Sequence, residues 1–144
     1  MIDQLTVFLE NAEGRLAKLV RSIAQAGINM QALTLADTPE YGVVRIICTD
    51  ALLARAALEA EGYSAMVTKV AAVEVPNKPG GLADLLGILD ELDIPVEYGY
   101  CFSAKDERAI DILKIKLPED ATAATSALEK AGFRLLDQED IAQM

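Results

Sequence analysis

Histidine is absent from the chain of 144 residues, and cysteine occurs only twice. Histidine is the commonest general base and the commonest ligand of transition metals, so its absence argues against enzymes and metal sites of those kinds. Cys48 and Cys101 lie far apart in apolar, strand-like segments. We therefore expect two buried thiols in a reducing cytoplasm rather than a disulfide or a metal-binding pair.

Basic charge and long apolar runs are also scarce. Lys and Arg number 13 against 23 Asp and Glu, which gives a formal net charge of −10. Nucleic-acid binding needs a basic surface, so this composition argues against it. No apolar run approaches the roughly 18 residues of a membrane span, and the start Met1-Ile2-Asp3-Gln4 has no features of a secretory signal. We expect a cytoplasmic protein with no nucleic-acid or membrane partner.

What the sequence does contain is a repeat. Residues 11–17, Asn-Ala-Glu-Gly-Arg-Leu-Ala, return as residues 77–83, Asn-Lys-Pro-Gly-Gly-Leu-Ala, a shift of 66 (77 minus 11). Residues 127–133 echo residues 57–63 at a shift of 70 (127 minus 57), which indicates a four-residue insertion between the two matches. A repeat of this length predicts two similar modules. The predicted domains are residues 1–68 and 69–144.

The same order of elements is predicted in each copy. In the first copy the apolar patterns indicate strands over residues 5–9, 28–36, 43–48 and 63–68. An amphipathic helix that Gly27 ends and a second helix over residues 51–61 complete a βαββαβ unit. Residues 64–75 contain no Gly or Pro, so one strand can pass into the next copy without a flexible linker. We expect an α+β fold of two ferredoxin-like modules side by side, each an antiparallel sheet with helices on one face.

The repeated loops are the first candidate for a binding site. The first turn of a helix presents backbone N–H groups without partners, which suits a carboxylate. Gly14 and Gly80 allow close approach of a ligand, and the side-chain amides of Asn11 and Asn77 offer both donors and acceptors. From spacing alone, the same asparagines can instead form Asx-turns or cap the helices.

Three aromatic residues alternate in the second copy. Tyr98, Tyr100 and Phe102 share one face if their strand is regular. They are then either core residues or part of a contact surface, such as a dimer interface or the wall of a ligand site. The sequence offers little support for catalysis at the repeated loops. Arg15 follows the glycine of the first loop, but the matching residue in the second copy is Gly81.

The chain resembles the ACT domain, a family of small regulatory modules that sense amino acids. The resemblance is carried by a strand, Asn-x-x-Gly-x-Leu, an amphipathic helix and Gly27-Ile28-Asn29-Met30 inside a βαββαβ unit. It covers nearly the whole chain, twice. It implies a stand-alone tandem ACT-domain protein that is regulatory rather than catalytic and uses no cofactor or metal. The implied partners are a small-molecule effector, a second copy in a homodimer and a metabolic enzyme.

The resemblance also implies site residues. ACT domains typically hold an amino acid at an interface between modules or subunits, through the loop before the first helix and the start of a facing module's second strand. Carried over by position, this implies Asn11, Ala12, Glu13, Gly14 and Asn29 in the first copy, and Asn77, Lys78, Pro79 and Gly80 in the second.

The half-sites implied in this way are unequal. Pro95 stands where the first copy has Asn29, and proline has neither a side-chain amide nor a backbone N–H. Some serine-responsive members carry a histidine two residues before the loop asparagine, where this chain has Leu9 and Val75. Serine is therefore not implied as the effector. The alternative function is a regulatory subunit that binds an enzyme and has no ligand of its own.

Overall fold

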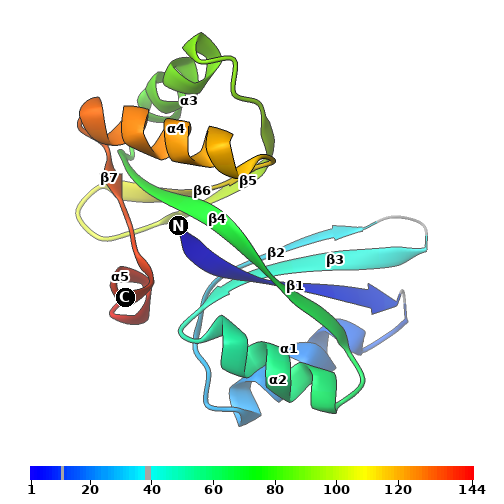
Figure 1. Ribbon diagram of the computed structural model, residues 1–144. Coiled ribbons are helices and arrows are strands. Elements are labelled where there is room, and N and C mark those ends of the chain that lie inside the picture. Colours follow the sequence, from blue (N-terminus) through cyan, green and yellow to red (C-terminus); the bar gives the residue numbers. More distant parts are fainter. Residues whose placement is uncertain (11, 38–39) are drawn as a thin grey trace. The chain divides into compact units, whose positions relative to one another are not determined.

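The structure, a computed structural model, describes residues 1–10, 12–37 and 40–144. Within these residues the chain forms seven strands and five helices in the order βαββαβαββαβα (Figure 1). The elements are β1 (Ile2–Glu10), α1 (Arg15–Gln25), β2 (Met30–Asp37), β3 (Tyr41–Cys48), α2 (Ala51–Ala60), β4 (Ser64–Pro76), α3 (Gly81–Glu91), β5 (Val96–Ser103), β6 (Arg108–Ile115), α4 (Pro118–Lys130), β7 (Arg134–Leu135) and α5 (Gln138–Ala142).

The chain divides into two compact units. The N-terminal unit consists of residues 3–68 and 138–144, and the C-terminal unit of residues 1–2 and 69–137. The division at 68/69 falls inside β4, a continuous strand of 13 residues. The predicted passage from one copy to the next without a linker is therefore confirmed. The domain bounds 1–68 and 69–144 stay a prediction.

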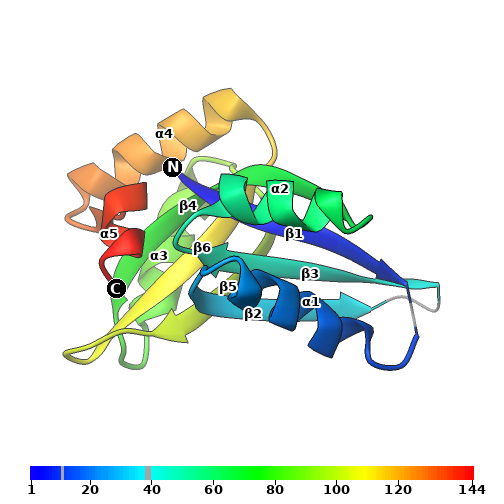
Figure 2. The same cartoon turned by 90° about the horizontal axis from the view of Figure 1, so that it is seen from below.

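The N-terminal unit contains a sheet in the order β2-β3-β1-β4, in which β3 is antiparallel to both β1 and β2. The first residues of β4 belong to it, and the hydroxyl oxygens of Thr6 and Thr68 lie 3.2 Å apart. Helices α1 and α2 cover one face (Figures 1 and 2). There the apolar stripe that predicted α1, represented by Leu19, packs with Val7 and Leu58 in a buried core.

The C-terminal unit repeats this arrangement in the order β5-β6-β4-β7. Helices α3 and α4 cover one face of its sheet, where Leu85 and Leu128 pack with Val73 (Figure 1). The fourth strand, β7, is only two residues long, and its Leu135 pairs with Val73. Two ferredoxin-like modules with antiparallel strands and helices on one face are thus confirmed.

One core position differs between the units. In the N-terminal unit Val7 pairs with Val44, whereas in the C-terminal unit Val73 pairs with Asp111. Val44 is completely buried and Asp111 is 4% exposed. The Asp111 Oδ2 atom has no hydrogen-bond partner among the described residues, and burial raises the pKa of this carboxyl group. A carboxyl group therefore occupies a position that the other copy fills with an apolar side chain.

The helices α1 to α4 end in the same kind of turn. A residue with positive φ follows each helix: Gly27 at 75°, Gly62 at 89°, Asp93 at 54° and Gly132 at 93°. The N–H of the next residue then donates to a helical carbonyl five positions earlier, at 3.0 to 3.3 Å. Glycine adopts this left-handed conformation without the clash that a Cβ atom introduces. Among the described helix ends of this type, only the end of α3 has a residue other than glycine, Asp93, at this position.

The two cysteines have different surroundings. Cys48 is completely buried, and burial raises the pKa of its thiol to about 11. Cys101 lies on β5, the outer strand of its sheet, and is exposed. The prediction of two buried thiols is correct for Cys48 and wrong for Cys101, because an apolar strand pattern does not distinguish an edge strand from a central one.

The C-terminal helix α5 was not predicted from the sequence. It belongs to the N-terminal unit, where Ile141 is completely buried. The Asp3 N–H donates to Gln138 Oε1 at 3.0 Å, and Gln31 Nε2 donates to the Ile141 carbonyl at 3.3 Å. The last residues of the chain therefore complete the unit that its first strand begins. Across the described ranges, none of the helices is long and apolar enough to cross a membrane.

Candidate functional site

The loop of the C-terminal unit joins β4 to α3. Its residues Asn77, Lys78, Pro79 and Gly80 are all exposed. Backbone hydrogen bonds fix its first two residues: Asn77 N–H donates to the Glu107 carbonyl at 2.8 Å, and Lys78 N–H to the carbonyl at the end of β4 at 2.9 Å. The loop is therefore tied to the strand end and to the turn before β6, while its side chains face solvent.

The loop of the N-terminal unit has the same backbone pattern. Asn11 lies outside the described residues, and Ala12, Glu13 and Gly14 are exposed. Ala12 N–H donates to the Glu10 carbonyl at 2.9 Å, as Lys78 does one copy later. The helix-start bonds also correspond, with Lys18 N–H to the Gly14 carbonyl at 3.0 Å matching the bond of Asp84 to Gly80 at 2.9 Å. The repeated sequence thus encodes a repeated local structure.

Glycine is needed at both helix starts because of backbone conformation. Gly14 has φ 75° and Gly80 has φ 90°, and a Cβ atom on either would meet nothing within 4 Å. Both occupy the N-cap position, where no side-chain acceptor is present. The first-turn N–H groups of a helix have no intrahelical acceptor, and the helix dipole is positive at this end. Each loop therefore provides an exposed, uncapped helix start that suits an anionic group.

The residue after each glycine separates the copies. In α3 a Cβ atom on Gly81 would lie 2.2 Å from the Pro76 carbonyl oxygen, so only glycine fits. In α1 the matching residue is Arg15, whose Nη2 lies 3.2 Å from Glu10 Oε2. The first loop thus carries an ion pair where the second allows a close backbone approach.

Asn29 does not lie beside the loop of its own unit. On β3, Tyr41 pairs with Glu10, the last residue of β1, whereas Cys48 pairs with Met30, the first residue of β2. The end of β1 and the start of β2 are therefore at opposite ends of the sheet. Asn29 N–H donates to Thr49 Oγ1 at 3.3 Å, at the end remote from Ala12–Gly14.

The same holds for Pro95, which precedes β5. Val96 pairs with Ile115, at the far end of β6 from Arg108, which pairs with Pro76 beside the loop. Any site that joins a loop to the start of a second strand therefore needs a second module.

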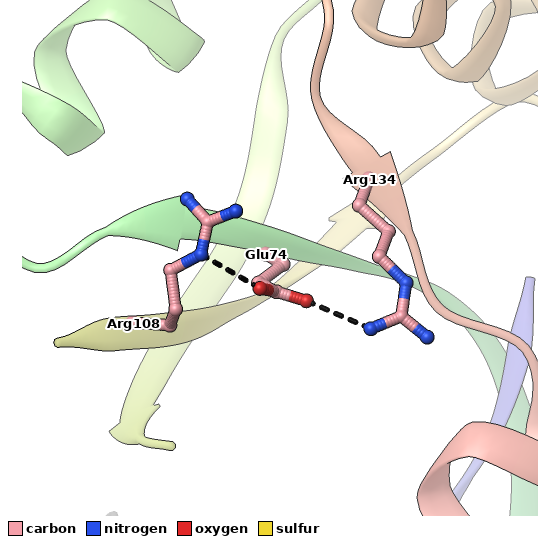
Figure 3. Close-up of polar contacts among 3 residues, drawn as sticks. All are labelled: Glu74, Arg108 and Arg134. Atoms are coloured by element: carbon pink, nitrogen blue, oxygen red, sulfur yellow. Dashed lines mark hydrogen bonds and ion pairs between the residues drawn. The ribbon is translucent and has the colours of Figure 1, made fainter. Parts of the chain in front are cut away.

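Sequence reasoning missed a charged cluster beside the second loop. Glu74 on β4 lies between two arginines (Figure 3): its Oε1 is 2.8 Å from Arg108 Nε and its Oε2 is 3.1 Å from Arg134 Nη1. The Glu74 side chain is only 15% exposed, whereas the arginines are 45% and 59% exposed. One carboxylate thus pairs with two guanidinium groups, one from β6 and one from β7. The only sequence signal was a single acidic residue in an apolar strand.

The corresponding positions in the first copy hold an aromatic pair. Phe8 is the counterpart of Glu74, and Tyr41 is the counterpart of Arg108 by strand register. The rings of Phe8 and Tyr41 are 6.2 Å apart at 64° to each other, and both residues are exposed. An exposed aromatic pair thus adjoins the first loop and an ionic cluster adjoins the second.

The alternation of Tyr98, Tyr100 and Phe102 on one face is confirmed by the register. They pair in succession with Lys114, Ile112 and Ile110, and each is partly buried. Their role stays open between core and contact surface. Groups of three or more His, Cys, Asp or Glu that could hold a metal ion do not occur among the described residues.

Comparison with known proteins identifies relatives. A family model described as ACT domain pair matches residues 1–144. A protein from Bacteroides thetaiotaomicron has a similar structure with a TM-score of 0.91 and 29% identity, covering 99% of this chain and 96% of that one. Comparison with curated proteins finds no match.

Two further solved structures share the fold. The regulatory subunit of aspartate kinase from Thermus thermophilus has a TM-score of 0.62 and 22% identity, with 90% and 92% of the two chains covered. The corresponding subunit from Thermus flavus has a TM-score of 0.60 and 21% identity, with 90% and 91% covered.

Proposed function

Since this chain belongs to the ACT domain pair family, we propose that it is a non-catalytic regulatory protein that binds a small molecule, an amino acid. The observation that carries the proposal is the pair of exposed loops that share corresponding backbone hydrogen bonds among their described residues, each at a helix start capped only by glycine. Such a helix start suits the α-carboxylate of an amino acid. We further propose that the protein is cytoplasmic and acts as a homodimer.

In the proposed site, each loop contributes its backbone and its asparagine. The loop residues are Asn11, Ala12, Glu13 and Gly14 in one copy, and Asn77, Lys78, Pro79 and Gly80 in the other. The side-chain amides of Asn11 and Asn77 would contact the ammonium and carboxylate groups of the ligand. Asn29 would come from a facing module, because its own unit holds it at the opposite end of the sheet.

Two structures with the same fold are described as regulatory subunits of aspartate kinase. Their identity to this chain is 22% and 21%, so the likeness establishes fold rather than ligand. Together with the family it supports a regulatory role in which the partner is a metabolic enzyme.

The test is a thermal-shift screen against the twenty common amino acids. A ligand that binds only the folded state stabilises it by about 2.7 kcal/mol at 100 times its dissociation constant. The variant carrying both Asn11→Ala and Asn77→Ala should lose the shift and keep the unliganded Tm. The control is Gln25→Ala, which removes an exposed side-chain amide at the end of α1 and should leave the thermal shift unchanged. A shift that survives the double substitution would refute the loop site.

A second candidate function is a regulatory subunit that binds an enzyme and has no ligand of its own. It is favoured by two exposed aromatic side chains of the N-terminal unit whose rings contact each other, Phe8 at 40% and Tyr41 at 43%. Exposed apolar residues that lie together mark interaction surfaces. Absence of a thermal shift with every amino acid, together with co-purification of one enzyme, would favour this alternative.

A further inference from the structure

A cavity of about 310 Å³ lies in the C-terminal unit, between the end of β6 and the start of α4. Lys69, Lys114 and Lys116 line it, and among the residues that the structure describes no carboxylate does. This is unusual for a chain with 23 acidic and 13 basic residues. The cavity is separated from the Asn77–Gly80 loop by the length of β6, so it does not belong to the site proposed above.

The walls of the cavity combine a buried apolar floor with polar groups. Ile115 and Ala121 on the floor are 3% and 6% exposed. Lys114 is partly buried, and its Nζ donates to the Ile115 carbonyl at 2.8 Å. An ammonium group has three N–H donors, so this bond positions the charge and leaves two donors for a ligand.

The start of α4 adds to the positive potential. Its N-cap is Leu117, which provides no side-chain acceptor, and Pro118 follows it. The positive end of the helix dipole therefore faces the region where the lysines gather. Glu119 and Asp120 belong to the same turn but do not line the cavity.

We propose that this cavity binds a small multivalent anion of the phosphate class, such as a phosphate ester or pyrophosphate. Lysine ammonium groups act as point charges that suit phosphate oxygens, and several of them around one cavity suit an anion that carries more than one negative charge. The volume is at the lower end of ligand cavities, which range from about 300 to 1,000 Å³. The site is a second one, distinct from the amino-acid loops.

The long-range field of the protein opposes such binding. A net charge of −10 repels anions at a distance, so affinity depends on the lysines that line the cavity, above all Lys114 and Lys116. Charges at a partly open cavity are screened by salt over about 10 Å at 0.1 M. Binding should therefore weaken steeply as sodium chloride is added.

The experiment is a titration of the full chain with pyrophosphate. Binding is measured by isothermal titration calorimetry and by the change in Tm at matched ionic strength. The expected result is saturable binding that weakens at least tenfold when Lys114→Gln and Lys116→Gln are combined. Lys116→Gln alone removes an exposed charge with little risk to folding, and it should weaken binding severalfold. Lys130→Gln in the last turn of α4 removes the same charge outside the cavity and should change affinity less than twofold.

Three outcomes would overturn the proposal. One is stabilisation by sodium chloride equal to that by pyrophosphate at the same ionic strength, which would indicate general screening of charge. Another is equal binding of citrate, which would show that the site does not select phosphate. The third is unchanged affinity in both lysine variants, which would place the anion elsewhere.

Discussion

Replacing Asp111 by valine should stabilise the protein. Asp111 is 4% exposed, its Oδ2 has no hydrogen-bond partner among the described residues, and its counterpart in the other unit is the fully buried Val44. A buried polar atom without a partner destabilises the folded state by about 1–3 kcal/mol. Valine removes this penalty and buries methyl groups against Val73, as Val44 does against Val7. We expect a gain of about 2 kcal/mol at neutral pH.

The gain should depend on pH with a defined sign. Burial raises the pKa of the Asp111 carboxyl group above its unfolded value. The folded state then binds the proton more tightly, so wild-type stability falls as pH rises from the unfolded pKa through the folded pKa. The advantage of Asp111→Val is therefore largest above the folded pKa and smallest near pH 4, the pKa of about 3.9 for an unperturbed aspartate.

Urea denaturation at several pH values measures this effect. A gain of about 2 kcal/mol should also raise Tm by roughly 4–8 °C in a protein of this size. Asp111→Asn keeps a polar group and removes the charge, so its gain should be smaller than that of valine. The reverse substitution, Val44→Asp, should destabilise by more than about 3 kcal/mol. If Asp111→Val proves less stable than wild type, the carboxyl group has a stabilising partner and the reasoning fails.

Three further experiments test the fold. Gly81→Ala should lower the free energy of unfolding by about 2 kcal/mol, because the new Cβ atom would clash with a strand carbonyl. Arg15→Ala at the matching position of the first copy should lower it by less than about 1 kcal/mol. Equal effects in urea denaturation would contradict the close approach at the second loop. Asp93→Gly should stabilise by about 0.5 kcal/mol by relieving a left-handed φ, and a lower urea midpoint would refute this. A thiol reagent should label Cys101 in the native protein and Cys48 only after unfolding, because Cys48 is buried with a pKa of about 11; rapid labelling of both would contradict the burial.

The architecture was predictable because the signals that encode it are local. The shift of 66 residues, the apolar periodicities and the glycines after the helices each concern a few neighbouring positions. Gly27, Gly62 and Gly132 all have the positive φ that a helix end requires. The absence of Gly and Pro from residues 64–75 likewise predicted that β4 continues from one copy into the next.

The features that were missed depend on register and on strand order. Glu74 meets Arg108 and Arg134 only because β4 lies between β6 and β7. Cys101 is exposed because β5 ends the strand order, which no pattern within β5 reveals. The helix α5 is short and its one buried residue, Ile141, gives no periodic signal.

The candidate site was predictable in its backbone and much less so in its side chains. Both loops have corresponding hydrogen bonds, as the repeated glycines imply. The surroundings follow from residues that do not lie in the repeated motif, such as Phe8 in one copy and Glu74 in the other. The remote position of Asn29 follows from the βαβ order, in which a helix returns the chain to the end of the sheet where the first strand began.

The two copies differ at pairs of positions that contact each other across neighbouring strands. The differences are therefore not independent substitutions at the surface. In the first copy Phe8 and Tyr41 form a ring contact, and in the second Glu74 and Arg108 form an ion pair at the same two positions. Exchanging one member alone would place an aromatic ring against a charge and leave Glu74 with a single arginine. The first loop therefore adjoins an aromatic pair, and the second adjoins an ionic cluster. Under the function proposed above, corresponding loop backbones in unequal environments should bind one ligand with different affinities.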